Sequence, residues 1–178
     1  MIELRGNPEV FFSDSPSIAL GLDQVEQLKE QALKNPRRRC RLCIHQDETD
    51  PIHQMVIVHM NDTYVRPHKH RTRTESFHMI EGKCSLVLFD EEGGIRDIVH
   101  LGLPGSGQSY FFKTTERLFH TTLIHTDIAV FLETTEGPFL RDDTLFPPWA
   151  PNGEDDTEVS KYLEDLHAIV SQRDPYPA

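Results

Sequence analysis

Short β-prone runs separated by turn-forming residues fill the chain from Arg39 to Thr134. They lie at 39–44, 54–60, 64–70, 75–80, 84–89, 95–101, 108–112, 120–124 and 128–134. The clearest turn is 90–94, where two glycines supply the positive φ that tight turns need. Many short strands joined in this way are typical of a β-sandwich or barrel. The pattern therefore predicts an all-β fold for this part of the chain.

A helical pattern precedes the β-prone region. Asp23 followed by Glu26 is a capping-box-like start, and Asn35-Pro36 is a stop. The apolar positions between them share one helix face: Val25, Leu28, Ala32 and Leu33. Residues 1–22 hold Pro8, Pro16 and Gly21 among scattered apolar residues. We expect an irregular lead-in there.

A second helical pattern ends the chain. Residues 141–151 are predicted to form an extended arm that Trp149 anchors on the barrel. Residues 155–157 can cap a helix that follows the arm. The apolar stripe of that helix is Val159, Tyr162, Leu163, Leu166, Ile169 and Val170. It must bury against the same subunit or a second one. A chain of 178 residues with 37% hydrophobic residues fits one domain, with a lead-in and helix at 1–37, a barrel at 38–140 and the arm and helix at 141–178.

A metal-ligand pattern lies in the middle of the β-prone region. His68 and His70 are two residues apart, so a strand places both imidazoles on one face. After a short polar link, Glu75 is the first inward residue of the next strand, which Gly82 would close. The candidate fourth ligand is His120, at the start of another alternating run. Imidazole and carboxylate together suit one divalent metal ion, Fe, Mn, Ni, Co or Zn.

These residues carry a family resemblance. The spacing of His68, His70, Glu75 and Gly82 resembles the first cupin motif, and His120 stands in the place of the second-motif histidine. Residues 35–39, 64–70, 137–139 and 149–151 resemble the WbuC-type cupin metalloproteins, a similarity over roughly 35–151. The resemblance implies a cupin jelly-roll β-barrel, one bound metal ion, a homodimer and an association with surface-polysaccharide biosynthesis. The ligand it implies is a sugar or nucleotide-sugar intermediate.

Four positions depart from the general cupin motifs. Asp62 stands where the first motif begins with Gly, and Thr115 and Arg117 stand where the second has Pro and Gly. Ile124 replaces the closing Asn of the second motif. We therefore expect the turn before His120 to be built differently.

Tyr64 and Arg66 share the parity of the two histidines, which predicts that they too point into the cavity. A cation inside a barrel needs an anionic partner, so Arg66 either binds a carboxylate or phosphate of a small ligand or pairs with Glu81 or Glu133. Tyr64 and Glu81 are the candidate bases for proton transfer. The binding of a small anionic molecule follows as a hypothesis, and the resemblance implies that this molecule is sugar-derived.

Other candidate sites have a structural interpretation. His59 and His125 lie at odd offsets from the ligands and are predicted to face away, whereas His45 and His53 are candidates for the barrel mouth. Cys40 and Cys43 match a C-x-x-C pattern, but residues three apart on a strand face opposite sides. The basic run at 34–41 either balances an acidic protein on a solvated or intersubunit face or holds a phosphate or a partner's carboxylates.

Charge and cysteine content limit the class of protein. A net charge of −11 opposes nucleic acid or an anionic membrane as the main partner. Three cysteines cannot all pair, and the N-terminal residues lack the layout of a signal peptide, so a cytoplasmic protein is expected.

Three functions remain open. The first is a metal-dependent enzyme, such as an isomerase or epimerase, that uses Lewis-acid chemistry on an anionic sugar-like molecule. The second is a non-catalytic binding or sensing module, since no base is obvious. The third is an Fe(II) dioxygenase, for which an open site of this kind is also suited.

Overall fold

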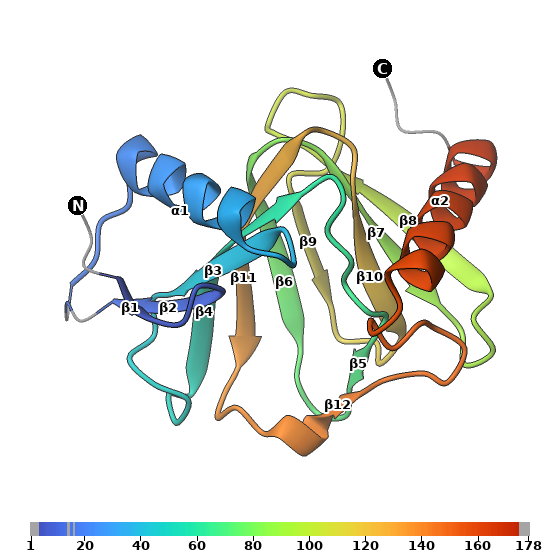
Figure 1. The fold of residues 1–178 in the computed structure, drawn as a ribbon. Helices are drawn as coiled ribbons and strands as arrows, with labels where there is room; N and C mark the ends of the chain where they lie inside the picture. Colours follow the sequence, from blue (N-terminus) through green and yellow to red (C-terminus); the bar gives the residue numbers. More distant parts are fainter. Residues whose placement is uncertain (1–3, 14, 16, 175–178) are drawn as a thin grey trace.

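Two β-sheets face each other in the computed structural model, which describes residues 4–13, 15 and 17–174. In the seven-stranded sheet the order is β1 (Leu4–Gly6), β2 (Val10–Ser13), β3 (Arg39–Cys43), β4 (Ile52–Met60), β11 (Ile128–Glu136), β6 (Glu75–Glu81) and β9 (Phe111–Thr114). The three-stranded sheet has the order β10 (Phe119–Ile124), β7 (Cys84–Phe89) and β8 (Ile95–Leu101). A short ladder joins β5 (Lys69–His70) to β12 (Thr144–Leu145). Together the strands form the predicted jelly-roll barrel (Figure 1).

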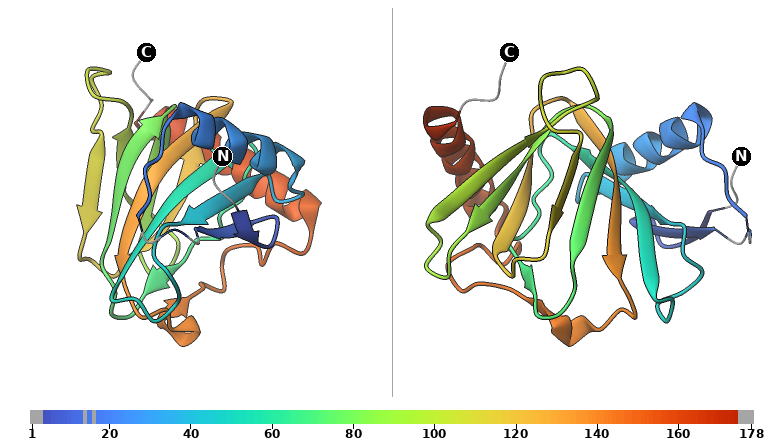
Figure 2. Two further views of the ribbon diagram at one scale, coloured as in Figure 1. Left: turned by 90° about the vertical axis from the view of Figure 1, so that its left-hand side faces the viewer. Right: turned by 180° about the vertical axis from the view of Figure 1, so that it is seen from behind.

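The two helices lie on opposite outer sides of the barrel (Figures 1 and 2). Helix α1 (Leu22–Lys34) packs Val25, Leu28 and Ala32 on the outer face of β3, β4 and β11. Helix α2 (Asp156–Arg173) packs Leu166 and Val170 on the outer face of the three-stranded sheet. The stripe of the last helix therefore buries against its own chain, except that Ile169 remains 49% exposed.

The barrel interior is apolar below the candidate ligands. Both sheets contribute to this core, whose members include Met55, Ile57, Phe77, Met79, Leu86, Ile124 and Phe131. Burial of each such side chain contributes roughly 1.5–3 kcal/mol relative to exposure. The filled interior confines any chemistry to the end of the barrel where β5 and β12 pair.

Several local predictions are confirmed. Gly82 has φ of +77° in the turn between β6 and β7, and a Cβ there would lie 2.2 Å from the Ile128 carbonyl oxygen. Asp155 caps α2 by accepting hydrogen bonds from the backbone of Thr157 and Glu158. The indole of Trp149 packs against Phe89 and donates to the Glu91 carbonyl, so it anchors the arm on the barrel as expected.

Other local predictions are wrong. The lead-in at 1–22 contains β1 and β2, and β2 extends the large sheet by pairing in parallel with β3. Helix α1 begins after Gly21, whose backbone N–H donates to the Gln24 side chain, so the start does not use Asp23 with Glu26. The sequence pattern could not show the β2–β3 pairing or the helix start at Gly21, because both depend on tertiary contacts that override local propensity.

Two predicted strands are displaced or shortened. The run at 64–70 is a regular strand only at Lys69–His70, because Pro67 has no N–H and Thr121 donates a side-chain hydrogen bond to the Val65 carbonyl. The run at 108–112 becomes β9 at Phe111–Thr114. The arm at 141–151 is not uniformly extended, since it contains a 3₁₀ turn, η1 (Arg141–Asp143), before β12. No helix in the described part of the chain is long and apolar enough to cross a membrane.

Candidate metal centre

Four predicted ligands converge at one end of the barrel interior. His68 and His70 lie on the short segment that ends in β5, Glu75 is the first residue of β6, and His120 lies on β10. An isolated antiparallel bridge ties His68 to His120, with N···O distances of 3.1 and 2.9 Å. One potential ligand atom from each of the four side chains lies within 4.8 Å of all the others. Such a group can hold a single metal ion.

Two of the imidazoles are oriented by the backbone carbonyl two residues earlier in the chain. Nδ1 of His68 is 3.0 Å from the Arg66 carbonyl oxygen, and Nδ1 of His120 is 3.2 Å from that of Leu118. A carbonyl only accepts, so each Nδ1 carries a hydrogen, and Nε2 is the ring nitrogen left to bind a metal ion. These Nε2 atoms are the ones that face the centre of the cluster.

The buried polar atoms at the centre fit a cation. Nε2 of His120 lies 3.0 Å from Glu75 Oε2, yet it is buried without a well-directed hydrogen bond among the described residues. A buried, unsatisfied imidazole nitrogen beside a carboxylate is the donor set that divalent transition metals prefer. The residues present therefore fit a metal ion.

The protonation states of the carboxylate and of one imidazole also suit a ligand set. Burial raises the pKa of Glu75, but its close contacts with the His120 and His70 imidazoles outweigh burial and hold the pKa well below its ordinary value. Burial, with the neighbouring His120, lowers the pKa of His68 to about 3. Glu75 is thus anionic and His68 neutral at physiological pH, as metal ligation requires.

The pKa of His120 is shifted in the opposite direction to that of His68. Burial lowers its pKa, but the close contact with Glu75 and the charge of that carboxylate more than compensate, and the net pKa is raised. A proton held between an imidazole and a carboxylate occupies the position that a metal cation would take. Metal binding at this centre would therefore compete with protons.

The candidate catalytic residues are not brought to the cluster. Tyr64 donates its hydroxyl hydrogen to the Pro151 carbonyl at 2.8 Å, its ring lies against Tyr162 of α2, and burial raises its pKa. Glu81 pairs with Lys29 of α1, with an Nζ···Oε1 distance of 2.6 Å. A register shift in the β6–β11 ladder places Glu81 opposite Val130, whose side chain packs under α1. This one-residue irregularity turns the Glu81 carboxylate to the outer side.

Arg66 lies near His68 but pairs with neither predicted acid. Its Nη2 donates to the Pro147 carbonyl at 3.3 Å, and its guanidinium carbon lies 4.8 Å from the centroid of the Phe146 ring. The same ring is 6.2 Å from that of His68. Nε of Arg66 is buried without a hydrogen-bond partner among the described residues.

Glu133 is a half-buried acid that sequence reasoning treated only as a partner for Arg66. It lies opposite Met55 and Phe77 in the sheet, so its side chain is on the interior side. Burial, then the charge of Glu75, raises its pKa to about 8. Its parity with the apolar Phe131 on the same strand was the available signal.

The other histidines divide between interior and exterior. The prediction for His59 is wrong: its ring is in the barrel interior, 5.3 Å from the Phe131 ring, and burial lowers its pKa to about 3. His125 faces the opposite side, toward α2, as expected. His45 and His53 stack at 4.0 Å at the ends of β3 and β4.

Two further interpretations are supported. Cys40 packs under α1 and Cys43 in the barrel interior, so the C-x-x-C pair faces opposite sides. In the basic run, Arg37 and Arg39 both bond Glu9, and Arg38 bonds Asp62. These ion pairs favour the balancing role over phosphate binding.

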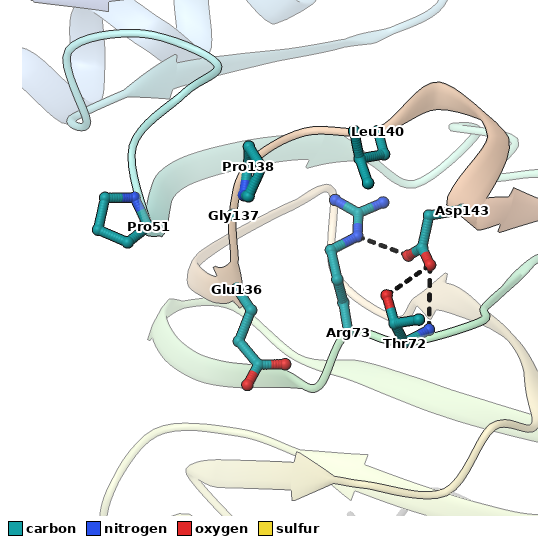
Figure 3. A pocket seen from close by; sticks show the side chains of 8 residues that line it. All are labelled: Pro51, Thr72, Arg73, Glu136, Gly137, Pro138, Leu140 and Asp143. Carbon is teal, nitrogen blue, oxygen red and sulfur yellow. Dashed lines mark hydrogen bonds and ion pairs between the residues drawn. The ribbon is translucent and has the colours of Figure 1, made fainter.

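A cavity of about 350 Å³ has none of the four candidate ligands in its lining (Figure 3). Its lining includes Thr72, Arg73 and Asp143, which hydrogen-bond one another, and the Gly137-Pro138 backbone. A more open groove of about 780 Å³ follows the arm from Arg141 to Phe146. Figure 3 shows Arg73 and Asp143 meeting at the wall of the first cavity.

Comparison with known proteins supports the fold. A family model described as a domain of unknown function, DUF6016, matches residues 20–101. The crystal structure of protein SO0799 from Shewanella oneidensis is similar with a TM-score of 0.51 and 14% identity, covering 76% of this chain and 85% of that one. The fold is that of a cupin.

Weaker similarities are of the same kind. A conserved protein with a double-stranded β-helix domain from Klebsiella pneumoniae has a TM-score of 0.47 and 11% identity, over 61% of this chain and 79% of that one. The capsular polysaccharide assembling protein CapF from Staphylococcus aureus also has a TM-score of 0.47, with 16% identity over 61% of this chain and 31% of its own chain. No curated protein sequence matches the chain.

Proposed function

We propose that this cupin binds one divalent metal ion through His68, His70, Glu75 and His120 and uses it to act on a small anionic molecule. The observation that carries the proposal is the convergence of the four ligand atoms within 4.8 Å, with a buried imidazole nitrogen left unsatisfied among them. Three neutral imidazoles and one carboxylate around a divalent ion leave a net charge of about +1. A centre with this charge attracts anions.

Arg66 supports an anionic ligand. Among the described residues no acid forms an ion pair with it, and its contacts are a carbonyl and an aromatic face. A buried or half-buried guanidinium without a counter-charge is costly, and a carboxylate or phosphate would relieve that cost. The ring of Phe146 joins Arg66 to His68, so such an anion would bind next to the metal ligands.

The sequence resemblance to WbuC-type cupins supports a finer assignment. We propose a sugar or nucleotide-sugar intermediate of surface-polysaccharide metabolism as the ligand. A bound divalent ion would supply Lewis-acid polarisation of a carbonyl or hydroxyl group. Glu133, whose pKa is raised by burial and by the charge of Glu75, is the interior group suited to hold and transfer a proton. Isomerisation or epimerisation could use both features.

A binding or sensing module is the second candidate. One observation favours it: the hydroxyl of Tyr64 and the carboxylate of Glu81 are engaged away from the ligand cluster. This candidate requires saturable ligand binding without a product.

The first test is elemental analysis of protein purified without added metal, together with the His70→Ala variant. We expect about one Fe, Mn, Ni, Co or Zn per native chain and none in the variant, because three ligands hold the ion less well than four. Equal metal content in both proteins would contradict the proposed centre. An empty native protein that also resists reconstitution would contradict it too.

The second test is a titration of the metal-loaded protein with inorganic phosphate. Arg66→Met should retain the metal but bind phosphate about tenfold more weakly, because one charge-assisted contact is worth roughly 1.5–3 kcal/mol. Arg96→Met is the matched control, since Arg96 pairs with the exposed Glu116 at the surface. Equal phosphate affinity in the two variants would remove Arg66 from the ligand site.

A further inference from the structure

The second ring nitrogen of His70 has an environment unlike that of the other two histidine ligands. Nε2 lies 2.9 Å from Glu75 Oε1 and faces the centre. Nδ1 has three side-chain neighbours in place of its own backbone carbonyl. They are Arg73 Nη2 at 3.1 Å, Thr144 Oγ1 at 3.3 Å and Asp143 Oδ2 at 3.6 Å.

The three neighbours favour different tautomers of the ring. The guanidinium of Arg73 only donates, so its contact requires an Nδ1 without hydrogen and therefore a hydrogen on Nε2. An Nε2 that carries hydrogen can donate to Glu75 but cannot bind a metal ion. Ligation through Nε2 moves the hydrogen to Nδ1, which then needs an acceptor. Only Thr144 and Asp143 offer one among the three.

Asp143 is fixed for this task by contacts on both oxygens. Its Oδ1 accepts from the Thr72 backbone N–H at 3.0 Å and from the Thr72 hydroxyl at 2.7 Å. Its Oδ2 accepts from Arg73 Nε at 2.8 Å and is the oxygen that faces His70. The side chain is 5% exposed, and Figure 3 shows it between Thr72 and Arg73. A buried carboxylate held this firmly cannot turn away from the ring.

The chain brings Asp143 to His70 from far away in the sequence. The turn η1 ends at Asp143, and β12 then pairs Thr144 with His70 across the short ladder. The Arg71 backbone N–H also donates to the Asp143 carbonyl at 3.0 Å. The arm that follows the barrel thus closes over the outer edge of a candidate ligand.

We propose that Asp143 is the positioning residue that makes His70 a metal ligand. With a metal ion at Nε2, the Asp143 carboxylate, now 3.6 Å from Nδ1, accepts the Nδ1 hydrogen together with Thr144 and replaces the present contact of Arg73 with that nitrogen. This inference rests on the proposed metal centre. The pair formed by Asp143 and Arg73 then has opposed effects. The carboxylate favours the metal-binding tautomer, and the guanidinium favours the tautomer that excludes the metal and adds a positive charge beside it.

The test compares Zn²⁺ affinity in the full chain and four variants by competition with a chelator. Asp143→Asn replaces the acceptor at Oδ2 by an N–H donor or a neutral oxygen, and we expect binding 10–100-fold weaker. Arg73→Met should bind Zn²⁺ as tightly as the native chain or more tightly. Asp142→Asn, the exposed neighbour, is the control and should not change the affinity. His70→Ala should lose most of the affinity.

Opposite changes in Zn²⁺ affinity in Asp143→Asn and Arg73→Met would exclude a purely structural role for the Arg73–Asp143 pair. If the Arg73–Asp143 pair only holds the arm in place, Asp143→Asn and Arg73→Met will weaken Zn²⁺ binding alike, and the inference is overturned. If His70→Ala loses Zn²⁺ while Asp143→Asn binds it normally, the role of Asp143 is contradicted and the proposed metal centre is retained. If His70→Ala binds Zn²⁺ as the native chain does, the proposed centre itself fails.

A measurement on the native chain guards against a variant that does not fold. In the Zn²⁺-loaded protein, nitrogen-15 NMR of the imidazoles should show His70 with hydrogen on Nδ1 and metal on Nε2. Its Nδ1 proton should exchange slowly with water, because buried acceptors hold it. Coordination of Zn²⁺ through Nδ1, or rapid exchange of that proton, would contradict the role of Asp143.

Discussion

The molecule holds two clusters that contain three histidines each, and they differ in what lies at their centre. The inner cluster is His68, His70, Glu75 and His120. The outer cluster, between the three-stranded sheet and α2, is Ser85, His100, His125 and His167. Both are largely enclosed and both join strands that are distant in sequence. The outer cluster has a carboxylate at its edge, with Asp174 Oδ2 3.6 Å from His100 Nε2. Within the described part of the chain, only the inner cluster brings one ligand atom from each side chain within 4.8 Å of all the others.

In the outer cluster a hydroxyl occupies the centre. The Ser85 Oγ lies 2.7 Å from His100 Nδ1 and 2.6 Å from His125 Nε2, and Ser85 is fully buried. His100 Nε2 in turn lies 3.0 Å from the Asp174 carbonyl oxygen. In the inner cluster the backbone takes the Nδ1 hydrogens of His68 and His120 and leaves their Nε2 atoms facing one another. The comparison shows that a metal site is marked by ring nitrogens that face a common centre, rather than by the number of histidines.

The most direct test of this difference between the clusters is to remove one histidine from each. His120→Ala should lower the affinity for Zn²⁺ by at least about 100-fold, because it deletes a ligand. His125→Ala should leave Zn²⁺ affinity unchanged. Chelator competition on both variants measures the difference, and equal losses would mean that the outer cluster also takes part in metal binding.

A smaller effect is expected when the centre of the outer cluster is removed. Ser85→Ala leaves two buried ring nitrogens without this partner and should reduce the free energy of unfolding by about 1–3 kcal/mol. Metal affinity should not change. Urea denaturation followed by circular dichroism provides the measurement, with Ser160→Ala on the exposed face of α2 as the control. An unaltered stability would show that the hydroxyl contributes nothing to the docking of α2.

The smallest effect is a pH dependence of stability. Burial, then His167 and His100, lowers the pKa of His125 to about 4, and burial also lowers the pKa of His167. The unfolded chain takes up protons below about pH 6.5, whereas the folded chain does so only at lower pH. This contribution to stability is therefore complete above pH 6.5 and is lost as the pH falls toward 4. Denaturation at pH 7 and pH 5 should show a smaller loss in His125→Gln than in the native chain, and identical losses would refute the assignment.

Local pattern was sufficient for the ligand set. His68 and His70 share a face because a strand alternates, and Glu75 follows where the polar link ends. The same parity argument failed for Tyr64, because Pro67 and the arm shorten the strand to two residues and the hydroxyl bonds the Pro151 carbonyl. It failed for Glu81 because of the register shift opposite Val130. Parity holds only as far as the ladder is regular.

The sequence by itself determined the all-β fold, its two flanking helices and the four residues that meet at the candidate metal centre. These depend on periodicity, turn residues and caps, which act over a few residues. The tertiary structure alone decided that Asp143 reaches His70, that His59 faces the interior, and that α2 packs on its own chain. Those outcomes depend on strand pairing and on the return of the arm to β5, where residues more than seventy positions apart come into contact. No local pattern encodes such a contact, because its free energy is gained only when the whole barrel has closed.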